Sequence, residues 1–236
     1  MNFSTQSFSL ALDTRPNQDA MATKHFSSGK LFAAVADGVG GQEGGAIASN
    51  MAIECAENEL ANEFSGSFED VFANVVKELQ KRSLEDNALK DMATTLSLIV
   101  AYDGQAHFAH VGDSRIYHLR NEGIHQITHD QTEVALLVRQ GILSVSRAKT
   151  YPRRSVLVSA LSAKGDYELM SGCFDIQPKD RILLISDGVH RLMTKKEIRD
   201  FSIGFPSLTD FTRQISLQLS LKGLKDDATL VAIEVS

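Results

Sequence analysis

The chain has 236 residues, of which 43% are hydrophobic and 23% are charged. These proportions are ordinary for a globular protein and exclude a disordered chain, a collagen-like repeat and a long coiled coil. No stretch approaches the roughly 18 consecutive apolar residues of a membrane span, and the first residues lack the basic start of a signal peptide, so we expect a cytoplasmic protein with no membrane partner.

The charged residues and the cysteines narrow the range of partners and cofactors. The chain has 30 Asp and Glu residues against 24 Lys and Arg residues, for a formal net charge of -6. A nucleic-acid partner is therefore not expected, because binding many phosphates needs a positive surface. Cys55 and Cys173 are isolated in apolar surroundings, and we expect both to be reduced core residues instead of zinc ligands or a disulfide.

The first half of the chain predicts a buried strand followed by two helices. No internal repeat, low-complexity tract or proline-rich linker divides the sequence, so we expect a single domain over residues 1–236. The apolar run Leu31–Ala36 is typical of a buried strand, and Asp37-Gly38 after it is typical of a turn. Apolar residues at helical spacing in residues 47–60 and 68–79 then predict two amphipathic helices.

The second half is richer in strands. An antiparallel meander with tight hairpin turns is predicted first. Its strands comprise residues 95–102, 106–111, 115–119 and 124–128. The elements that follow are a helix over Gln131–Gln140, a pair of strands at 167–176 and 180–186, a helix over Ser207–Leu221 and a closing strand over Thr229–Val235. Because helices come in pairs between blocks of strands, we expect the α+β class, with antiparallel sheets covered by helices.

Carboxylates stand at one end of four apolar strands. Asp37, Asp113 and Asp187 each follow a strand, and Asp226-Asp227 opens the last one. A single Asp after a strand is usually only part of a turn. Four such positions indicate more, because carboxylates that strand ends deliver into a water-poor cleft repel one another unless a cation neutralises them. Ligands that are all oxygen suit Mg²⁺ or Mn²⁺.

Seven short motifs occur in order over almost the whole chain: RPNQDA at 15–20, ADGVGG at 36–41, MATT at 92–95, HVGDSR at 110–115, ITHD at 127–130, LISDG at 184–188 and KDDAT at 225–229. With these motifs the chain resembles the PPM family of metal-dependent Ser/Thr protein phosphatases, in its compact bacterial form. Each motif alone is a weak match, whereas all seven in order are specific. The resemblance implies a four-layer sandwich of two antiparallel β-sheets flanked by pairs of α-helices.

The resemblance also implies a metal site. Asp37 would bridge two ions, and the Gly38 carbonyl would complete the coordination shell of one of them. Asp187 and Asp226 would hold the other ion. Asp113, shared with Asp187, would bind a third and weaker ion. The implied ions are Mn²⁺ or Mg²⁺, two of them in the core site.

The remaining roles follow from the same resemblance. Asp19 would act through metal-bound water, and Arg15 would grip the phosphoryl oxygens with its guanidinium. A pair of divalent ions about 3.5–4 Å apart lowers the pKa of a bridging water and neutralises the oxygens of an in-line displacement. The implied catalytic residues are Arg15, Asp37 and Asp187, and the implied reaction is hydrolysis of phospho-Ser/Thr by direct attack of a metal-bridging hydroxide.

The implied substrates are phosphorylated proteins, with a cognate Ser/Thr kinase, and we expect the chain to be a monomer. Two alternatives remain open. One is a dedicated phosphatase of an anti-sigma-antagonist-type regulator, which uses the same metal chemistry on one partner. The other is a non-catalytic pseudo-phosphatase that binds a phosphoprotein, although the retention of four costly carboxylates argues against it.

The chain departs from the family pattern at four positions. Gln18 stands where most members carry Glu, and we expect it to alter metal affinity without loss of activity. Asp227 stands where Asn is usual. Val39 occupies the place of a histidine proposed as the general acid in animal relatives, so that role is unassigned here. Ser159 stands where many relatives carry Arg.

Residues 131–165 resemble the family's mobile flap beside the active site. The segment carries a basic cluster of Arg147, Lys149, Arg153 and Arg154. Four cations in a loop are usually only solvated. They can also steer a phosphorylated, acidic protein segment toward the metals, and the sequence leaves these two interpretations open.

Overall fold

The computed structural model describes residues 1–13, 15–39, 44–61 and 67–236. Residues 40 and 41, the last two of the ADGVGG motif, lie outside the described residues. The strands are β1 (Phe3–Leu10), β2 (Asp19–His25), β3 (Leu31–Val39), β4 (Ala93–Thr94), β5 (Leu96–Tyr102), β6 (Gln105–Val111), β7 (Arg115–Arg120), β8 (Gly123–Gln126), β9 (Leu161–Ser162), β10 (Met170–Asp175), β11 (Arg181–Ile185) and β12 (Ala228–Val235).

The helices are α1 (Gly44–Ala61), α2 (Phe68–Glu85), α3 (Glu133–Arg139), α4 (Val145–Ala148), α5 (Asp187–His190), α6 (Lys195–Gly204) and α7 (Leu208–Lys222), and Asn87–Leu89 form a 3-10 turn. None of the helices in the described ranges has the length and apolarity needed to cross a membrane.

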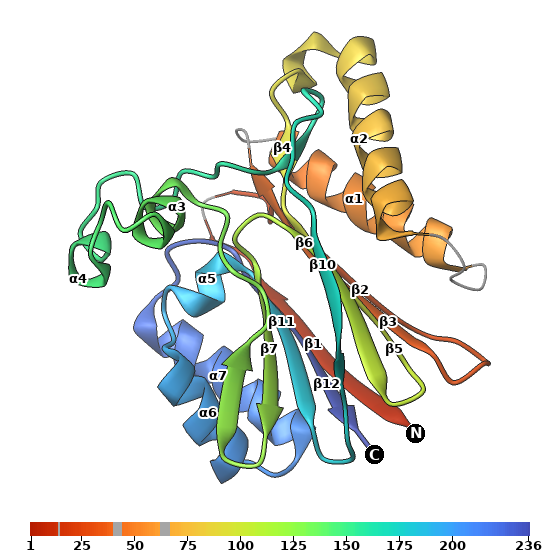
Figure 1. Ribbon diagram of the computed structural model, residues 1–236, viewed down its shortest axis with the longest axis vertical. Coiled ribbons are helices and arrows are strands. Elements are labelled where there is room, and N and C mark those ends of the chain that lie inside the picture. The colour runs from red at the N-terminus through yellow and green to blue at the C-terminus, as the bar shows by residue number, and fades with distance from the viewer. Residues whose placement is uncertain (14, 40–43, 62–66) are drawn as a thin grey trace.

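Two antiparallel sheets pack face to face between two layers of helices (Figure 1). In the described part of the chain, one sheet has five strands in the order β1-β12-β11-β7-β8. The other has seven, in the order β10-β6-β5-β3-β4-β9, with β2 paired to β3. Helices α1 and α2 cover the seven-stranded sheet, and α6 and α7 cover the five-stranded one. The predicted α+β class and its four-layer sandwich are confirmed.

Strand β3 shows how the sequence builds this core. Its side chains alternate between two faces, as in any strand. Leu31, Ala33 and Val35 pack into the cluster between the two sheets. Phe32 and Ala34 pack into the cluster beneath α1 and α2. Both faces of the strand are therefore buried, which explains why its sequence is continuously apolar over residues 31–36.

Small side chains let α1 lie close to β3. Ala48, Ala52 and Ala56, spaced four residues apart, are fully buried. The predicted helix is confirmed, but its buried stripe is centred on these alanines. The larger Ile47 and Met51 flank the stripe and are only partly buried. The close approach brings the start of α1 next to the end of β3, where the motif carboxylate Asp37 lies.

The predicted four-stranded meander is wrong at its centre. Strands β5 and β6 form a hairpin in the seven-stranded sheet, whereas β7 and β8 form a hairpin in the five-stranded sheet. The chain changes sheets at Gly112, whose φ of +115° is a conformation that L side chains rarely adopt. The sequence pattern does not reveal this change. Strands of both sheets face one shared core, so apolar and polar residues alternate in the same way in either sheet.

The predicted pairing of residues 167–176 with 180–186 is also wrong. Strand β10 pairs with β6, whereas β11 lies between β12 and β7 in the other sheet. The chain changes partners within three residues. The Ile176 N–H donates to the Gly104 carbonyl at 2.9 Å, and the Lys179 N–H donates to the Val235 carbonyl at 2.7 Å. The turn between them therefore links the two sheets.

Two local predictions also need correction. Strand β3 continues through Asp37-Gly38 to Val39 and does not turn there, because its last two residues pair with β4. Cys173 is exposed, since it lies in β10 at the edge of its sheet, where a small apolar side chain is not enclosed. Cys55 is half-buried and packs against the core beneath α1 and α2.

The segment of residues 131–165 carries α3 and α4, which project beside the sandwich (Figure 1), and it returns to the seven-stranded sheet at β9. Neither of these helices has a buried residue. The segment is tied to the sandwich at its start, where the Gln131 N–H donates to the Gly112 carbonyl at 2.8 Å. In the basic cluster, Arg153 forms an ion pair with Glu133 at 2.7 Å, so part of its charge is compensated within the segment.

Replacing Gly112 should destabilise the fold. A Cβ atom there would lie 2.4 Å from Thr95 Cγ2, so Gly112→Ala adds a steric conflict to the unfavourable backbone conformation. Gly104 is a matched control, because it also has positive φ but has open space around its Cβ position. We expect Gly104→Ala to cost about 1–2 kcal/mol and Gly112→Ala to cost about 1–3 kcal/mol more, measured by urea unfolding. Equal costs would contradict this account of the sheet change.

Candidate metal centre

Three carboxylates meet at one end of the sandwich. Oxygen atoms of Asp37, Asp113 and Asp187 all lie within 4.8 Å of one another. Asp37 belongs to β3 of the seven-stranded sheet, Asp113 follows β6, and Asp187 begins α5 directly after β11 of the five-stranded sheet. Asp113 and Asp187 are buried and Asp37 is half-buried. The cluster therefore lies where strand ends of the two sheets converge.

The backbone of Asp37 is held on both sides by two threonines. Its N–H donates to Thr95 Oγ1 at 3.0 Å, and its carbonyl accepts from the Thr95 N–H at 2.9 Å. The same carbonyl accepts from Thr94 Oγ1 at 3.0 Å. Thr95 Oγ1 also lies 3.0 Å from Ser114 Oγ. These bonds connect the strand that carries Asp37 to the turn that carries Asp113.

A close backbone contact brings the next two motifs together. A Cβ atom at Gly188 would lie 1.9 Å from the carbonyl oxygen of Asp227. Only glycine allows this approach, because any side chain would push the two segments apart. The contact places the loop that carries Asp226 against the short helix that carries Asp187. This explains why an Asp-Gly pair, and not Asp alone, occurs in the motif.

Burial and mutual repulsion raise the pKa values of the clustered carboxyls. Loss of solvation raises the pKa of Asp113 to about 7, and the charge of Asp187 adds to the shift. Loss of solvation also raises the pKa of Asp187, to about 6, against the opposing effect of Arg191. The pKa of Asp37 lies well above its ordinary range, because it is desolvated and surrounded by other carboxylates. Without a cation, ionising this cluster is costly.

Asp19 lies beside the cluster and is held by neighbouring hydroxyl groups. It is opposite Asp37 in the pairing of β2 with β3. Ser186 Oγ donates to Asp19 Oδ2 at 2.7 Å and accepts from the Thr229 N–H at 2.9 Å. Burial raises the pKa of Asp19 to about 7, although its bonds to Ser186 and Thr229 oppose the shift. Asp19 therefore connects β2 to the ends of β11 and β12.

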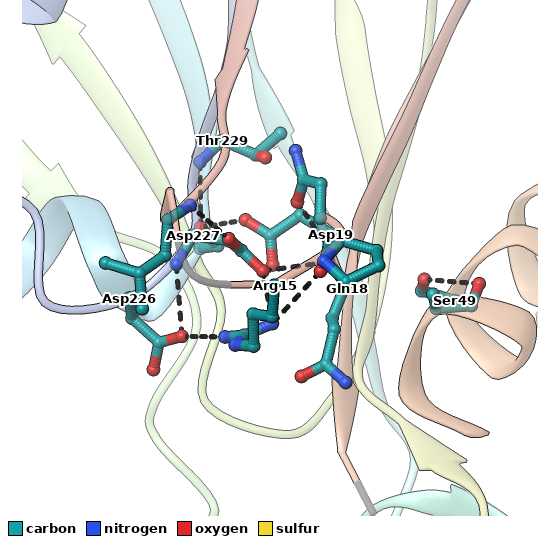
Figure 2. Close-up of polar contacts among 12 residues, drawn as sticks. Arg15, Gln18, Asp19, Ser49, Asp226, Asp227 and Thr229 are labelled. Atoms are coloured by element: carbon teal, nitrogen blue, oxygen red, sulfur yellow. Dashed lines mark hydrogen bonds and ion pairs between the residues drawn. The ribbon is translucent and has the colours of Figure 1, made fainter. Parts of the chain in front are cut away.

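Arg15 is fixed between two carboxylates, as Figure 2 shows. Its Nη2 donates to Asp226 Oδ1 at 2.5 Å, and its Nη1 donates to Asp227 Oδ2 at 2.6 Å. Asp227 is buried and also accepts from the backbone N–H groups of Leu12 and Gln18, at 2.7 and 2.8 Å. The Asp that replaces the usual Asn at 227 thus gives Arg15 a charged partner.

One cleft of about 580 Å³ contains nearly all of these groups. Its lining includes six of the seven residues singled out from the sequence: Arg15, Asp37, Gly38, Asp113, Asp187 and Asp226. Val156 and Leu157 of the projecting segment form part of the wall. The cleft therefore offers an acidic floor with a guanidinium beside it, next to a segment that stands out from the sandwich.

The other departures from the family pattern lie in different surroundings. Gln18 and Val39 both line the cleft, and Val39 brings no titratable group to it. Ser159 is buried, and its Oγ accepts a hydrogen bond from the Glu168 N–H at 2.9 Å. Its hydroxyl therefore stabilises the base of the projecting segment.

The donor set fits divalent cations. Among the described residues, Asp187 Oδ1 is a buried oxygen without a hydrogen-bond partner. Buried polar atoms in folded proteins nearly always have a partner, so an orphaned carboxylate oxygen needs an explanation. It lies within a cluster of carboxylates that supplies only oxygen ligands, which hard cations such as Mg²⁺ and Mn²⁺ prefer. A cation would satisfy the orphaned oxygen and neutralise the cluster.

Sequence reasoning assigned no role to three residues that shape this centre. Thr95 and Ser186 hold Asp37 and Asp19 through hydroxyl groups, a role that no charge pattern reveals. Arg191 lines the cleft and forms an ion pair with Asp187. A signal for Arg191 existed, because it follows Asp187 by four residues and such pairs lie on the same face of a helix.

Known proteins resemble this chain over nearly its whole length. The model of the family described as Protein phosphatase 2C matches residues 11–224. Over 227 residues the chain is 29% identical to Protein phosphatase PhpP of Streptococcus pneumoniae, a match that covers 93% of this chain and 92% of that protein.

Solved structures show the same fold. The serine/threonine phosphatase PstP/Ppp of Mycobacterium tuberculosis superposes with a TM-score of 0.89 at 25% identity, covering 100% of both chains. The catalytic domain of serine threonine protein phosphatase PstP in complex with 2 manganese ions superposes with a TM-score of 0.85 at 24% identity, covering 99% of each chain. The second structure shows this fold in a manganese-bound protein.

Neutralising one carboxylate should stabilise the metal-free protein. The pKa of Asp113 rises from 3.8 to about 7 on folding, so between these values the folded state binds more protons than the unfolded state. The contribution of Asp113 to stability therefore falls as pH rises through this range. We expect Asp113→Asn to be more stable than the wild type in chelator at pH 8, with a difference that shrinks toward pH 4.

Thermal unfolding with excess chelator at several pH values measures this difference. Comparing the two proteins at each pH cancels the opposing effect of the buried histidines His110 and His190, whose pKa values burial lowers to about 4 and about 3. A difference that is independent of pH would contradict the proposed repulsion.

Proposed function

Because the chain belongs to the protein phosphatase 2C family, we propose that it is a metal-dependent protein-serine/threonine phosphatase whose reaction takes place in the acidic cleft. The observation that carries the proposal is the convergence of Asp37, Asp113 and Asp187, together with the buried Oδ1 of Asp187, which has no hydrogen-bond partner among the described residues. Burying several carboxylates together lowers the stability of a protein, so stability alone does not explain such a cluster.

The cation site is assigned to residues that line the cleft. In this proposal Asp37, the Gly38 carbonyl, Asp187 and Asp226 hold two ions, Mn²⁺ or Mg²⁺, and Asp19 supports them through water. When bound, such ions would supply the positive charge that lowers the pKa of the attacking water and neutralises the phosphoryl oxygens. Asp113 would be the ligand of a third ion, together with Asp187.

The remaining residues orient the substrate and the ligands. Arg15 points its guanidinium into the same region and is pinned by Asp226 and Asp227. Three hydrogen bonds use part of its five N–H donors, and the others suit a phosphoryl oxygen. Because the arginine is pre-positioned, little entropy is lost when the substrate binds. Thr95 and Ser186 keep the carboxylates in place.

The partners follow from the chemistry. A hydrolase of phosphoserine and phosphothreonine esters requires a kinase that makes them, so we propose phosphorylated proteins as substrates and a Ser/Thr kinase as the opposing enzyme. We also propose that residues 1–236 act as a single domain and a monomer. Residues 131–165 would then be the flap that contacts the protein part of the substrate.

The two alternative functions are separable from this one. A dedicated phosphatase for one regulator uses the same site and differs only in its substrate range. A pseudo-phosphatase that binds a phosphoprotein without turnover has no use for the orphaned Asp187 oxygen. The comparisons favour turnover, because the relatives carry the names of phosphatases.

Phosphate release from a phosphothreonine peptide tests the proposed function. Purified protein is assayed with Mn²⁺, with Mg²⁺ and with excess chelator. We expect turnover with a divalent ion that chelator abolishes. Turnover that survives chelator would contradict the metal-dependent mechanism. A folded protein that binds Mn²⁺ but releases no phosphate would favour the pseudo-phosphatase or a dedicated enzyme.

Substitution of single Asp residues by Asn tests the assignment of Asp187 and Asp226 to the cation site. Asp187→Asn and Asp226→Asn remove one ligand charge each while keeping the side-chain shape, and we expect each to lower kcat/KM by more than about 100-fold, because even outer partners of metal ligands cost 10–100-fold. Asp200→Asn is the control, since Asp200 is exposed on α6 and pairs with its neighbour Arg199. Circular dichroism should show an intact fold in all three. Activity near that of the wild type in either site variant would overturn the assignment.

A further inference from the structure

Arg191 places a positive charge among the clustered carboxylates. It forms an ion pair with Asp187, and its Nη2 also lies 3.7 Å from Asp113 Oδ2. Its Nη1 lies 3.7 Å from Asp226 Oδ2. One guanidinium therefore faces three of the carboxylates assigned to the cation site. Its side chain is 36% exposed and lines the cleft.

The position of Arg191 follows from the helix that carries Asp187. Helix α5 spans Asp187–His190, and the backbone N–H of Arg191 donates to the Asp187 carbonyl at 2.9 Å. Residues four apart in a helical turn lie on the same face, where opposite charges attract. The neighbouring His190 Nε2 lies 3.0 Å from the Asp113 carbonyl, which holds this turn against the loop after β6. The guanidinium is thus directed to Asp113 as well as Asp187.

Two of the three carboxylates that Arg191 faces, Asp113 and Asp187, are the pair assigned to a third ion. A guanidinium is a permanent cation with flat donor groups that match carboxylate oxygens. A cation and a guanidinium cannot occupy the space between the same two carboxylates. Like-charged ions in contact would also repel each other. The geometry therefore makes Arg191 and a third divalent ion competitors.

We propose that Arg191 takes the place of a third cation between Asp113 and Asp187, so that this protein binds two divalent ions and supplies the third positive group from its own chain. The inference rests on the proposed function, because it takes the two-ion site as given. It assigns Arg191 to the site as a positioning residue that keeps Asp113 and Asp187 paired. It also revises the role of Asp113 from ion ligand to partner of Arg191.

Counting bound Mn²⁺ tests this proposal without measuring activity. Equilibrium dialysis against saturating Mn²⁺, followed by metal analysis, gives the number of ions per chain for the wild type and for Arg191→Met, which keeps the length of the side chain and removes its charge. We expect two ions on the wild type and one additional ion on the variant. Arg191→Lys, which restores a positive charge, should return the count to two.

A matched control separates this effect from a general change in charge. Arg199 is also 36% exposed and pairs with Asp200 on α6, so Arg199→Met removes the same charge away from the cleft. Its count should stay at two. In chelator, Arg191→Met should lower the melting temperature more than Arg199→Met, because the cluster loses its own cation. If Arg191→Met does not fold, Arg191→Gln replaces it in the same count.

The outcomes of the ion count separate the proposed role of Arg191 from the proposed function. Equal counts on the wild type and Arg191→Met, or three ions on the wild type, would overturn the role of Arg191 and leave the proposed function intact. A wild-type chain that binds no Mn²⁺ would overturn the proposed function together with this inference. An extra ion on Arg199→Met would show that net charge, and not the position of Arg191, sets the count.

Discussion

Repulsion among carboxylates at one end of the sandwich is the constraint on which the rest of the site depends. Asp37, Asp113 and Asp187 are brought within 4.8 Å of one another, and burial prevents water from screening them. The surrounding fold holds the site together: the Thr95 hydroxyl binds the backbone of Asp37, and the Ser186 hydroxyl binds Asp19 beside the cluster. A cluster of this kind persists only with positive partners, and in this chain those partners are arginines and, as we propose, divalent cations.

The sandwich explains why the cluster forms at this place. Each sheet buries one face against its helices and the other against the opposite sheet, so its interior has no room for charge. Polar groups can gather only where strands end. Because Gly112 moves the chain from one sheet to the other and Gly188 allows α5 to touch the loop before β12, strand ends of both sheets meet in one cleft. The architecture and the chemistry therefore rest on the same few backbone positions.

Much of this arrangement is readable from the sequence, and the exceptions have physical causes. The apolar run of β3 and the helical spacing in α2 reflect burial directly. The change of sheet at Gly112 and the crossing after Ile176 escape prediction, because apolar alternation does not say which sheet a strand joins. Strand β1, with the sequence FSTQSFSL, is not predicted, because its many serine and threonine residues leave too few apolar residues for a clear alternation. The motif carboxylates are visible in the sequence, whereas Arg191 shows only its four-residue spacing from Asp187, since its contacts with Asp113 and Asp226 come from other segments.

The most direct test of the central claim is a crystal structure of the protein with Mn²⁺, using anomalous diffraction at the manganese absorption edge to locate the ions. We predict anomalous density against the carboxylates of Asp37, Asp187 and Asp226, inside the cleft that Arg15 lines. Manganese that occupies only other surfaces of the molecule, with the Asp37 cluster empty at saturating Mn²⁺, would contradict this claim.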